Sequence, residues 1–195
     1  MIPNNPSEIL LTLDCELDHE VPLVLCGRAA LCLGFDQSPP EFQATQDVDA
    51  IISISQLPIL TNDLQFWDAI ETTNQALSPK GLYITHLFAE DQVFLRPYWE
   101  NFIVPIHSPK TRFLKLFRPH VVDLILTKMM RGNDALDMDD IRFLASTGNV
   151  TMAEIEDAFV SVRMPQDIPE LEEAFQRAIP TVREIIANAI RDESA

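Results

Sequence analysis

One short apolar run most constrains how this chain can fold. The run PLVLC, residues 22–26, is followed at once by Gly27 and then by RAALCL, whose alanines and leucines favour helix. A wholly apolar run of this length is typical of a buried strand, and the glycine is typical of a tight turn. We therefore predict a strand, a turn and a helix in direct succession.

Two aspartates open the next predicted strand, DVDAIISI, over residues 47–54. Side chains alternate between the two faces of a strand, so Asp47 and Asp49 project to one side and Val48 to the other. Carboxylates held this close repel each other unless a cation lies between them, and their hard oxygens suit Mg²⁺. The pair therefore predicts a metal site. The alternative is a strand end in open solvent, where water screens both charges.

The other segments before residue 118 mix helices with strands. Spacing and composition predict helices over 9–18 and 63–77 and strands over 81–88, 102–107 and 112–119. The first of these segments fits a strand as well as a helix. Two prolines among polar neighbours indicate a loop over 36–43. We expect an α+β fold with a mixed sheet of about five strands flanked by helices.

From Pro119 onward the sequence is typical of helices. Pro119 suits the first turn of a helix over HVVDLILTKMM, and Asp137 or Asp139 is expected to open the helix that contains DIRFLA. The segment TMAE, residues 151–154, is a capping-box pattern at the start of a further helix. In the last helical stretch, Pro180 is expected to kink or split the helix.

Length and charge limit the organisation and the partners of the protein. At 195 residues the chain can form one substantial core, placed at 1–118, with a helical part at 119–195 packed on it. A net charge of −16 disfavours nonspecific binding to nucleic acid or to an anionic membrane. The N-terminus lacks a basic and apolar leader pattern, and no run of eighteen apolar residues occurs, so we expect a cytoplasmic protein without a membrane partner.

Three segments in order, LVLCGRAALCLGF, ATQDVDAIIS and RPHVVDLILTKMMRGNDALDMDDIRFLA, together carry a family resemblance. The chain resembles the nucleotidyltransferase superfamily, and in particular its minimal bacterial branch, which includes the toxin halves of abortive-infection type toxin–antitoxin pairs. That branch has a G-G-x-A-L turn, a T-x-D-I-D strand, and a helix with a lysine, an arginine and a D-x-x-D-I segment. These features fall on Gly27 to Leu31, Thr45 to Asp49, Lys128, Arg131, Asp137, Asp140 and Ile141.

The resemblance implies a nucleotidyltransferase-like fold and a Mg²⁺-dependent reaction. A nucleotide would pass from a nucleoside triphosphate to an RNA or protein acceptor, and the protein would be a toxin–antitoxin component with a cognate antitoxin as partner. The implied catalytic residues are Asp47, Asp49 and Lys128, of which the two aspartates bind the metal. The implied nucleotide-binding residues are Gly27, Arg28 and Arg131.

Each assignment has a structural alternative. Gly27 can serve only as a turn residue, Lys128 can extend from a core helix to water, and Asp137, Asp139 and Asp140 can complement the positive end of their helix. We expect His86, which lies in an apolar strand, to be a packed or hydrogen-bonded histidine.

The sequence departs from the family pattern at two points. Arg28 stands where the family usually has glycine or serine, and it would either clash with the triphosphate or pair with it. Many polymerases of this superfamily use a third carboxylate, and this sequence has no clear counterpart of it. Glu90 and Asp91 are the best placed. The second hypothesis is therefore a catalytically inactive protein of the same fold that acts as a binding or regulatory module.

Overall fold

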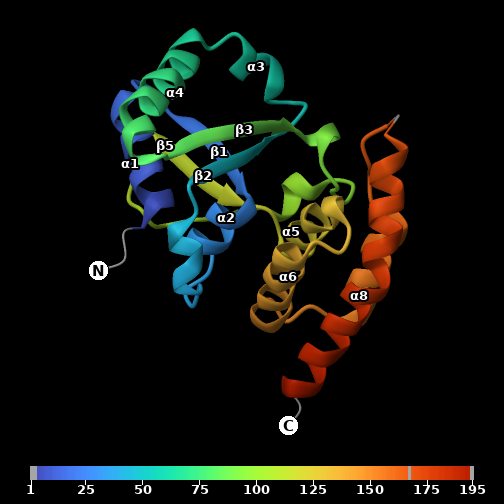
Figure 1. Cartoon of the computed structure of the whole chain (residues 1–195). Coiled ribbons are helices and arrows are strands. Elements are labelled where there is room, and N and C mark those ends of the chain that lie inside the picture. The colour runs from blue at the N-terminus through green and yellow to red at the C-terminus, as the bar shows by residue number, and fades with distance from the viewer. Residues whose placement is uncertain (1–3, 167, 194–195) are drawn as a thin grey trace. The chain divides into compact units, whose positions relative to one another are not determined.

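A computed structural model describes residues 4–166 and 168–193, and it divides the chain into two compact units (Figure 1). The first unit contains the described chain up to Ala89 together with Ile103–Arg118. The second contains Glu90–Phe102 and the chain from Pro119 onward. One junction lies at the boundary expected after residue 118. Residues 90–102, which the sequence predicts to belong to the core, are part of the second unit.

The first unit is built on a mixed sheet with the strand order β3-β2-β1-β5-β4 in the described part of the chain. The strands are β1 (Val21–Cys26), β2 (Asp47–Ile52), β3 (Tyr83–Ala89), β4 (Val104–Pro105) and β5 (Leu114–Arg118). Strand β1 is central, antiparallel to β2 and parallel to β5, while β2 runs parallel to β3 and β4 antiparallel to β5. The predicted α+β class with a five-stranded mixed sheet is confirmed.

Helices of the first unit pack against this sheet. They are α1 (Asn5–Glu16), α2 (Gly27–Leu33), α3 (Leu57–Thr61) and α4 (Leu64–Leu77), with 3₁₀ turns at Pro40–Ala44 and Ser78–Lys80. Helix α2 contacts β1 and β2, α1 contacts α4 and β2, and α4 contacts β3. The predicted helices over 9–18 and 63–77 are present, the latter capped by Asp63. Helix α3 was not predicted, and part of the expected loop over 36–43 is a 3₁₀ turn.

A buried carboxylate ties α1 to the start of β5. Oδ1 of Asp14 accepts hydrogen bonds from the backbone N–H groups of Phe113 and Leu114, and Oδ2 accepts one from Arg112, each at 2.8 Å. Burial alone would raise the pKa of Asp14, but the three N–H donors and the charge of Arg112 outweigh it, so the pKa lies below its ordinary value. Asp14 therefore anchors the sheet as a charged group.

The second unit consists of helices α5 (Val121–Lys128), α6 (Ala135–Thr147), α7 (Met152–Ser161) and α8 (Pro169–Glu193). The 3₁₀ turns Glu90–Gln92, Trp99–Phe102 and Met129–Arg131 complete its described part. Helix α6 contacts α5 and α8, and α7 contacts the same two helices. None of the helices in residues 4–166 and 168–193 is long and apolar enough to cross a membrane.

The helix boundaries correct two predictions and confirm one. The cap of α5 is His120, so Pro119 precedes the helix instead of lying in its first turn. The cap of α6 is Asp134, whose side chain accepts from the N–H groups of Leu136 and Asp137; the prediction that Asp137 or Asp139 opens this helix was wrong. The capping box of Thr151 and Glu154 is present.

Helix α8 runs through Pro180 without a break, so of the predicted kink or split the split is wrong. A proline inside a helix removes one backbone hydrogen bond and crowds the preceding turn. Phe175, Ala178 and Val182 are nevertheless buried on both sides of Pro180. Because tertiary packing supplies most of the stability of a helix in a protein, this apolar face keeps α8 continuous.

The segment 90–102 is bound to the second unit by backbone and side-chain contacts. Leu95 and Arg163 form an antiparallel bridge, and the ring of Phe94 packs edge-on against Phe175. Asp123 is fully buried and accepts three hydrogen bonds from Arg96, one from the backbone N–H at 3.0 Å and two from the guanidinium at 3.1 and 2.7 Å. The negative charge of the buried Asp123 is therefore compensated by Arg96 of the segment 90–102, which we call the inserted segment.

Candidate functional site

The glycine turn after β1 lies against the carboxylate of Asp49. Cys26, the last residue of β1, pairs with Asp49 of β2, and Gly27 follows with a φ of +61°. A Cβ atom at Gly27 would lie 3.3 Å from Oδ2 of Asp49. The glycine turn and the aspartate strand are therefore neighbours in space, and only glycine fits both the backbone conformation and the short distance.

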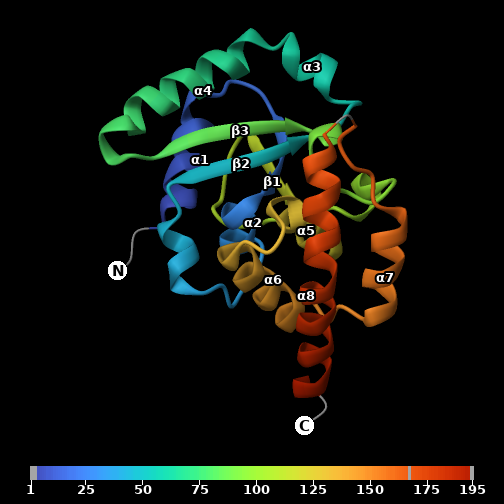
Figure 2. The ribbon, with the colours of Figure 1, turned by 45° about the vertical axis from the view of Figure 1, so that its right-hand side comes forward.

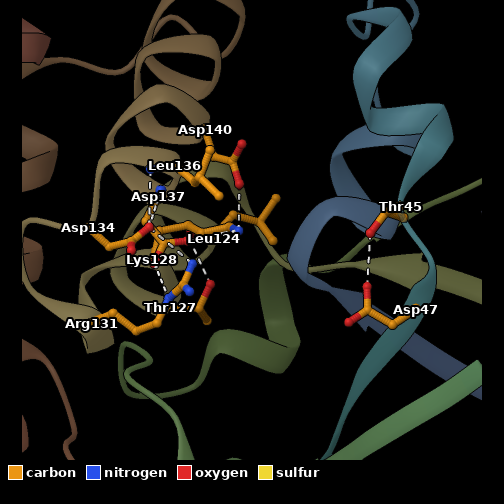
Figure 3. A network of polar contacts seen from close by, with 10 residues as sticks. All are labelled: Thr45, Asp47, Leu124, Thr127, Lys128, Arg131, Asp134, Leu136, Asp137 and Asp140. Carbon is orange, nitrogen blue, oxygen red and sulfur yellow. Dashed lines mark hydrogen bonds and ion pairs between the residues drawn. The ribbon is translucent and has the colours of Figure 1, made fainter.

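The two aspartates of β2 alternate with a buried residue, as predicted for a strand. Asp47 is exposed and Asp49 half-buried, whereas the intervening Val48 has no exposed surface. The hydroxyl of Thr45 donates to Oδ1 of Asp47 at 2.8 Å, as Figure 3 shows. Both carboxylates thus belong to the face opposite Val48.

A β-bulge in β3 places two residues opposite Asp49. Val48 pairs with Ile84 but Ala50 pairs with Leu87, so Thr85 and His86 share the position across from Asp49. The hydroxyl of Thr85 donates to Oδ1 of Asp49 at 2.6 Å, and Nδ1 of His86 lies 3.1 Å from the same oxygen. The bulge therefore holds one oxygen of Asp49 from β3, while the other oxygen lies near the glycine turn.

His86 is the residue that sequence reasoning missed. We expected a packed or hydrogen-bonded histidine; it is hydrogen-bonded, but 63% of its side chain is exposed, and its ring stacks on Phe88. The consecutive polar residues Thr85 and His86 inside the run GLYITHLF were the available signal, since one strand face cannot hold two successive side chains.

Two carboxylates on one strand face are ligands of the type that Mg²⁺ takes in proteins. In the described ranges, 4–166 and 168–193, no cluster of three or more histidine, cysteine, aspartate or glutamate side chains could hold a metal. Mg²⁺ is commonly bound by only one or two carboxylates together with water and substrate phosphates. Asp47 and Asp49 match that mode and do not form a closed protein cage.

Arg28 directs its guanidinium toward an aromatic ring. Its Cζ atom lies 5.5 Å from the centroid of the Phe42 ring, in the range of a cation–π contact. Residue 42 is buried in the 3₁₀ turn Pro40–Ala44. Arg28 therefore packs on its own unit next to the glycine turn.

Lys128 and Arg131 form a network with buried aspartates of the second unit (Figure 3). The amine of Lys128 lies 2.6 Å from Oδ2 of Asp140 and 3.2 Å from Oδ1 of Asp137. Nε of Arg131 lies 2.6 Å from Oδ2 of Asp137, and this hydrogen bond raises the pKa of Arg131. Both aspartates are almost completely buried. The structural alternative, in which Lys128 extends to water, is wrong because its amine is held between two carboxylates.

The two groups of predicted site residues belong to different units. Gly27, Asp47 and Asp49 are in the first unit, and Lys128 and Arg131 are in the second. Each group is well defined within its own unit, so their joint action on a nucleotide stays a prediction.

Glu90 has a structural role in the second unit. Its carboxylate accepts from the indole N–H of Trp99 at 3.2 Å and pairs with Arg163 at 3.3 Å. Its side chain is only 10% exposed. These contacts fasten the inserted segment 90–102, which accounts for Glu90 without the role of a third metal-binding carboxylate.

Comparisons with known proteins assign no family: no family model, no curated protein and no solved structure matches this chain. The resemblance of the three sequence segments to nucleotidyltransferases is therefore the basis of a proposal.

Replacing Gly27 with alanine should lower the free energy of unfolding by about 1–2 kcal/mol, because a non-glycine residue is strained at positive φ and the new Cβ crowds Asp49. Gly81→Ala is the matched control: φ is +67°, but the nearest atom to its Cβ is 3.8 Å away. Urea unfolding of both variants should show the larger loss for Gly27→Ala. Equal losses would contradict crowding against Asp49.

Proposed function

We propose that the first unit binds a nucleoside triphosphate with Mg²⁺ and that the protein is a nucleotidyltransferase. The observation that carries the proposal is the contact of the Gly27 turn with the Asp49 carboxylate. A glycine leaves the backbone N–H groups of the turn uncovered, so a phosphate can approach them beside a carboxylate that is able to bind its metal.

In this proposal Asp47 and Asp49 hold the metal, which would draw charge from the phosphates and orient them when bound. The chain's own residues fix the geometry around it. Thr85 and His86 hold Oδ1 of Asp49, and this contact restricts rotation of the carboxylate. A carboxylate with a restricted orientation loses less entropy when it binds a metal, as expected for a supporting shell of hydrogen bonds.

The acceptor is proposed from charge and from the family resemblance. The net charge of −16 opposes approach of a bare RNA, so a protein hydroxyl is the favoured acceptor. The same resemblance supports a toxin–antitoxin component with a cognate antitoxin as its partner.

One observation favours the second hypothesis, a binding or regulatory module without catalysis. Lys128 and Arg131, the cations assigned to the phosphates, are paired with carboxylates of their own unit. Their positive charge is thereby compensated, which leaves less of it for a triphosphate.

Titration calorimetry with each of the four nucleoside triphosphates and Mg²⁺ tests the proposal. Wild-type protein should bind at least one of them, and Asp49→Asn should weaken that binding at least about tenfold, because a metal ligand is lost. Asp36→Asn makes the same chemical change at an exposed position outside the site and should leave binding unchanged. No heat with any nucleotide would contradict nucleotide binding.

Transfer of a radiolabelled α-phosphate to RNA or protein separates the two hypotheses. Labelled acceptor that disappears with Asp49→Asn supports the enzyme. Binding of the nucleotide without any labelled acceptor supports the noncatalytic module.

A further inference from the structure

Four large apolar side chains are exposed on α3 and the first turn of α4. The exposed fractions are 36% for Leu57, 71% for Ile59, 75% for Leu64 and 39% for Trp67. A single exposed apolar residue is ordinary, but four within eleven consecutive residues make this segment a candidate interaction site. We call these four residues the α3–α4 surface.

The side chain of Trp67 connects the two helices of this surface. Its indole N–H donates to the backbone oxygen of Leu60 at 2.8 Å, so the polar end of the ring is satisfied at the end of α3. Figure 2 shows α3 and α4 in direct succession along one side of the first unit. The exposed part of the indole therefore adds apolar area beside α3.

Helix α4 has two different stripes at helical spacing. Phe66, Ala69 and Thr73 are buried and face the unit. Leu64, Trp67, Asp68 and Glu71 are exposed, and they follow each other at intervals that place them on one face of the helix. The exposed stripe therefore begins apolar and becomes acidic within two turns.

No basic residue balances this stripe in the surrounding sequence. Of the seven aspartates and glutamates between Arg28 and Lys80, Asp68 and Glu71 lie on the exposed face of α4, and this stretch contains neither lysine nor arginine. A partner that covers the α3–α4 surface therefore meets negative charge next to apolar side chains. Negative charge beside an apolar surface restricts which partners can bind more than the apolar surface alone does.

We infer that the α3–α4 surface binds a basic amphipathic helix of another protein. Apolar side chains of that helix cover Leu57, Ile59, Leu64 and Trp67, and its lysines or arginines pair with Asp68 and Glu71. A second copy of this chain is disfavoured because it would bring the same carboxylates toward each other. Anionic membranes and nucleic acids are repelled for the same reason.

A synthetic 18-residue helical peptide of leucine and lysine, without tryptophan, is the probe. Trp99 is 2% exposed and Trp67 is 39% exposed, so a change in tryptophan emission reports mainly on Trp67. The peptide should produce a saturable blue shift as it covers the indole. The same peptide with glutamate in place of lysine should produce none.

Paired variants locate the binding, which is measured by the anisotropy of the labelled peptide. Ile59→Ser/Leu64→Ser should weaken binding at least about tenfold, since two apolar side chains that the peptide would bury are lost. Val160→Ser, at an 89% exposed apolar position of α7, should leave it unchanged. Asp68→Asn/Glu71→Gln should weaken binding more than Glu170→Gln/Glu172→Gln, which removes the same charge from exposed positions on α8.

Three results would overturn the inference. They are the absence of a blue shift with the basic peptide, unchanged affinity of Ile59→Ser/Leu64→Ser, and equal weakening by the two pairs of charge variants. Sedimentation of the wild type provides a fourth test: a concentration-dependent dimer that is lost in Ile59→Ser/Leu64→Ser would show that a second copy covers the surface. None of these measurements depends on nucleotide binding.

Discussion

Replacing Lys128 with alanine should lower the free energy of unfolding by about 3–5 kcal/mol, the usual cost of removing one partner from a buried ion pair. The amine of Lys128 lies between Asp137 and Asp140, which are 3% and 1% exposed. Without it, two carboxylates stay buried with less compensating charge. Urea unfolding followed by circular dichroism measures the loss.

Two further variants make the Lys128 result specific. Lys110→Ala removes an exposed lysine of the first unit and should change the free energy of unfolding by less than about 0.5 kcal/mol. Lys128→Met/Asp137→Asn/Asp140→Asn removes the buried charges together and should recover a large part of the loss. A loss below about 1 kcal/mol in Lys128→Ala would mean that the network contributes little to folding.

This effect changes how a nucleotide-binding test of Lys128 is interpreted. A variant that is partly unfolded binds less nucleotide whatever the role of the missing amine. Binding by Lys128→Ala should therefore be compared with the wild type only under conditions in which circular dichroism shows both to be folded.

Replacing Asp14 with alanine should cost about 3 kcal/mol at pH 7, because three backbone N–H groups lose a charged acceptor. The contribution should depend on pH in a defined direction. Since the pKa of Asp14 is lower in the folded protein than its ordinary value of 3.8, its stabilising effect is present above that value and is lost as pH falls through the folded-state pKa.

Urea unfolding of the wild type and of Asp14→Asn at a series of pH values tests this dependence. The difference between the two proteins should be constant near neutral pH and should shrink below about pH 4. Asp36→Asn, at an exposed position, should give no such difference. A gap between wild type and Asp14→Asn that does not change with pH would contradict the depressed pKa.

Features determined by neighbours in the sequence could be predicted. Thr151 and Glu154 are three residues apart and cap the same helix, so four consecutive residues specify the start of α7. The turn at Gly27 follows from an apolar run that ends in glycine. By contrast, Asp134, Asp137 and Asp139 are all suitable caps, and only the backbone shows that Asp134 is the one used.

Features that depend on distant pairing could not be predicted. The approach of Thr85 and His86 to Asp49 depends on a register shift between β2 and β3, which no local pattern specifies. Asp14 finds its three donors almost a hundred residues later in the chain. The partners of Lys128 lie only 9 and 12 residues away, yet they are reached through the packing of α5 on α6.

The inserted segment 90–102 has a consequence for the order in which the chain is made. Ribosomal synthesis releases these residues before any helix from Pro119 onward exists, so Phe94 and Trp99 emerge without the second unit that later buries them. The buried Asp123 likewise emerges after Arg96, the residue that neutralises it. The apolar side chains of the segment therefore stay exposed while β5 completes the first unit. Phe94 and Trp99 become buried only after the helices of the second unit from Pro119 onward have been made and have folded.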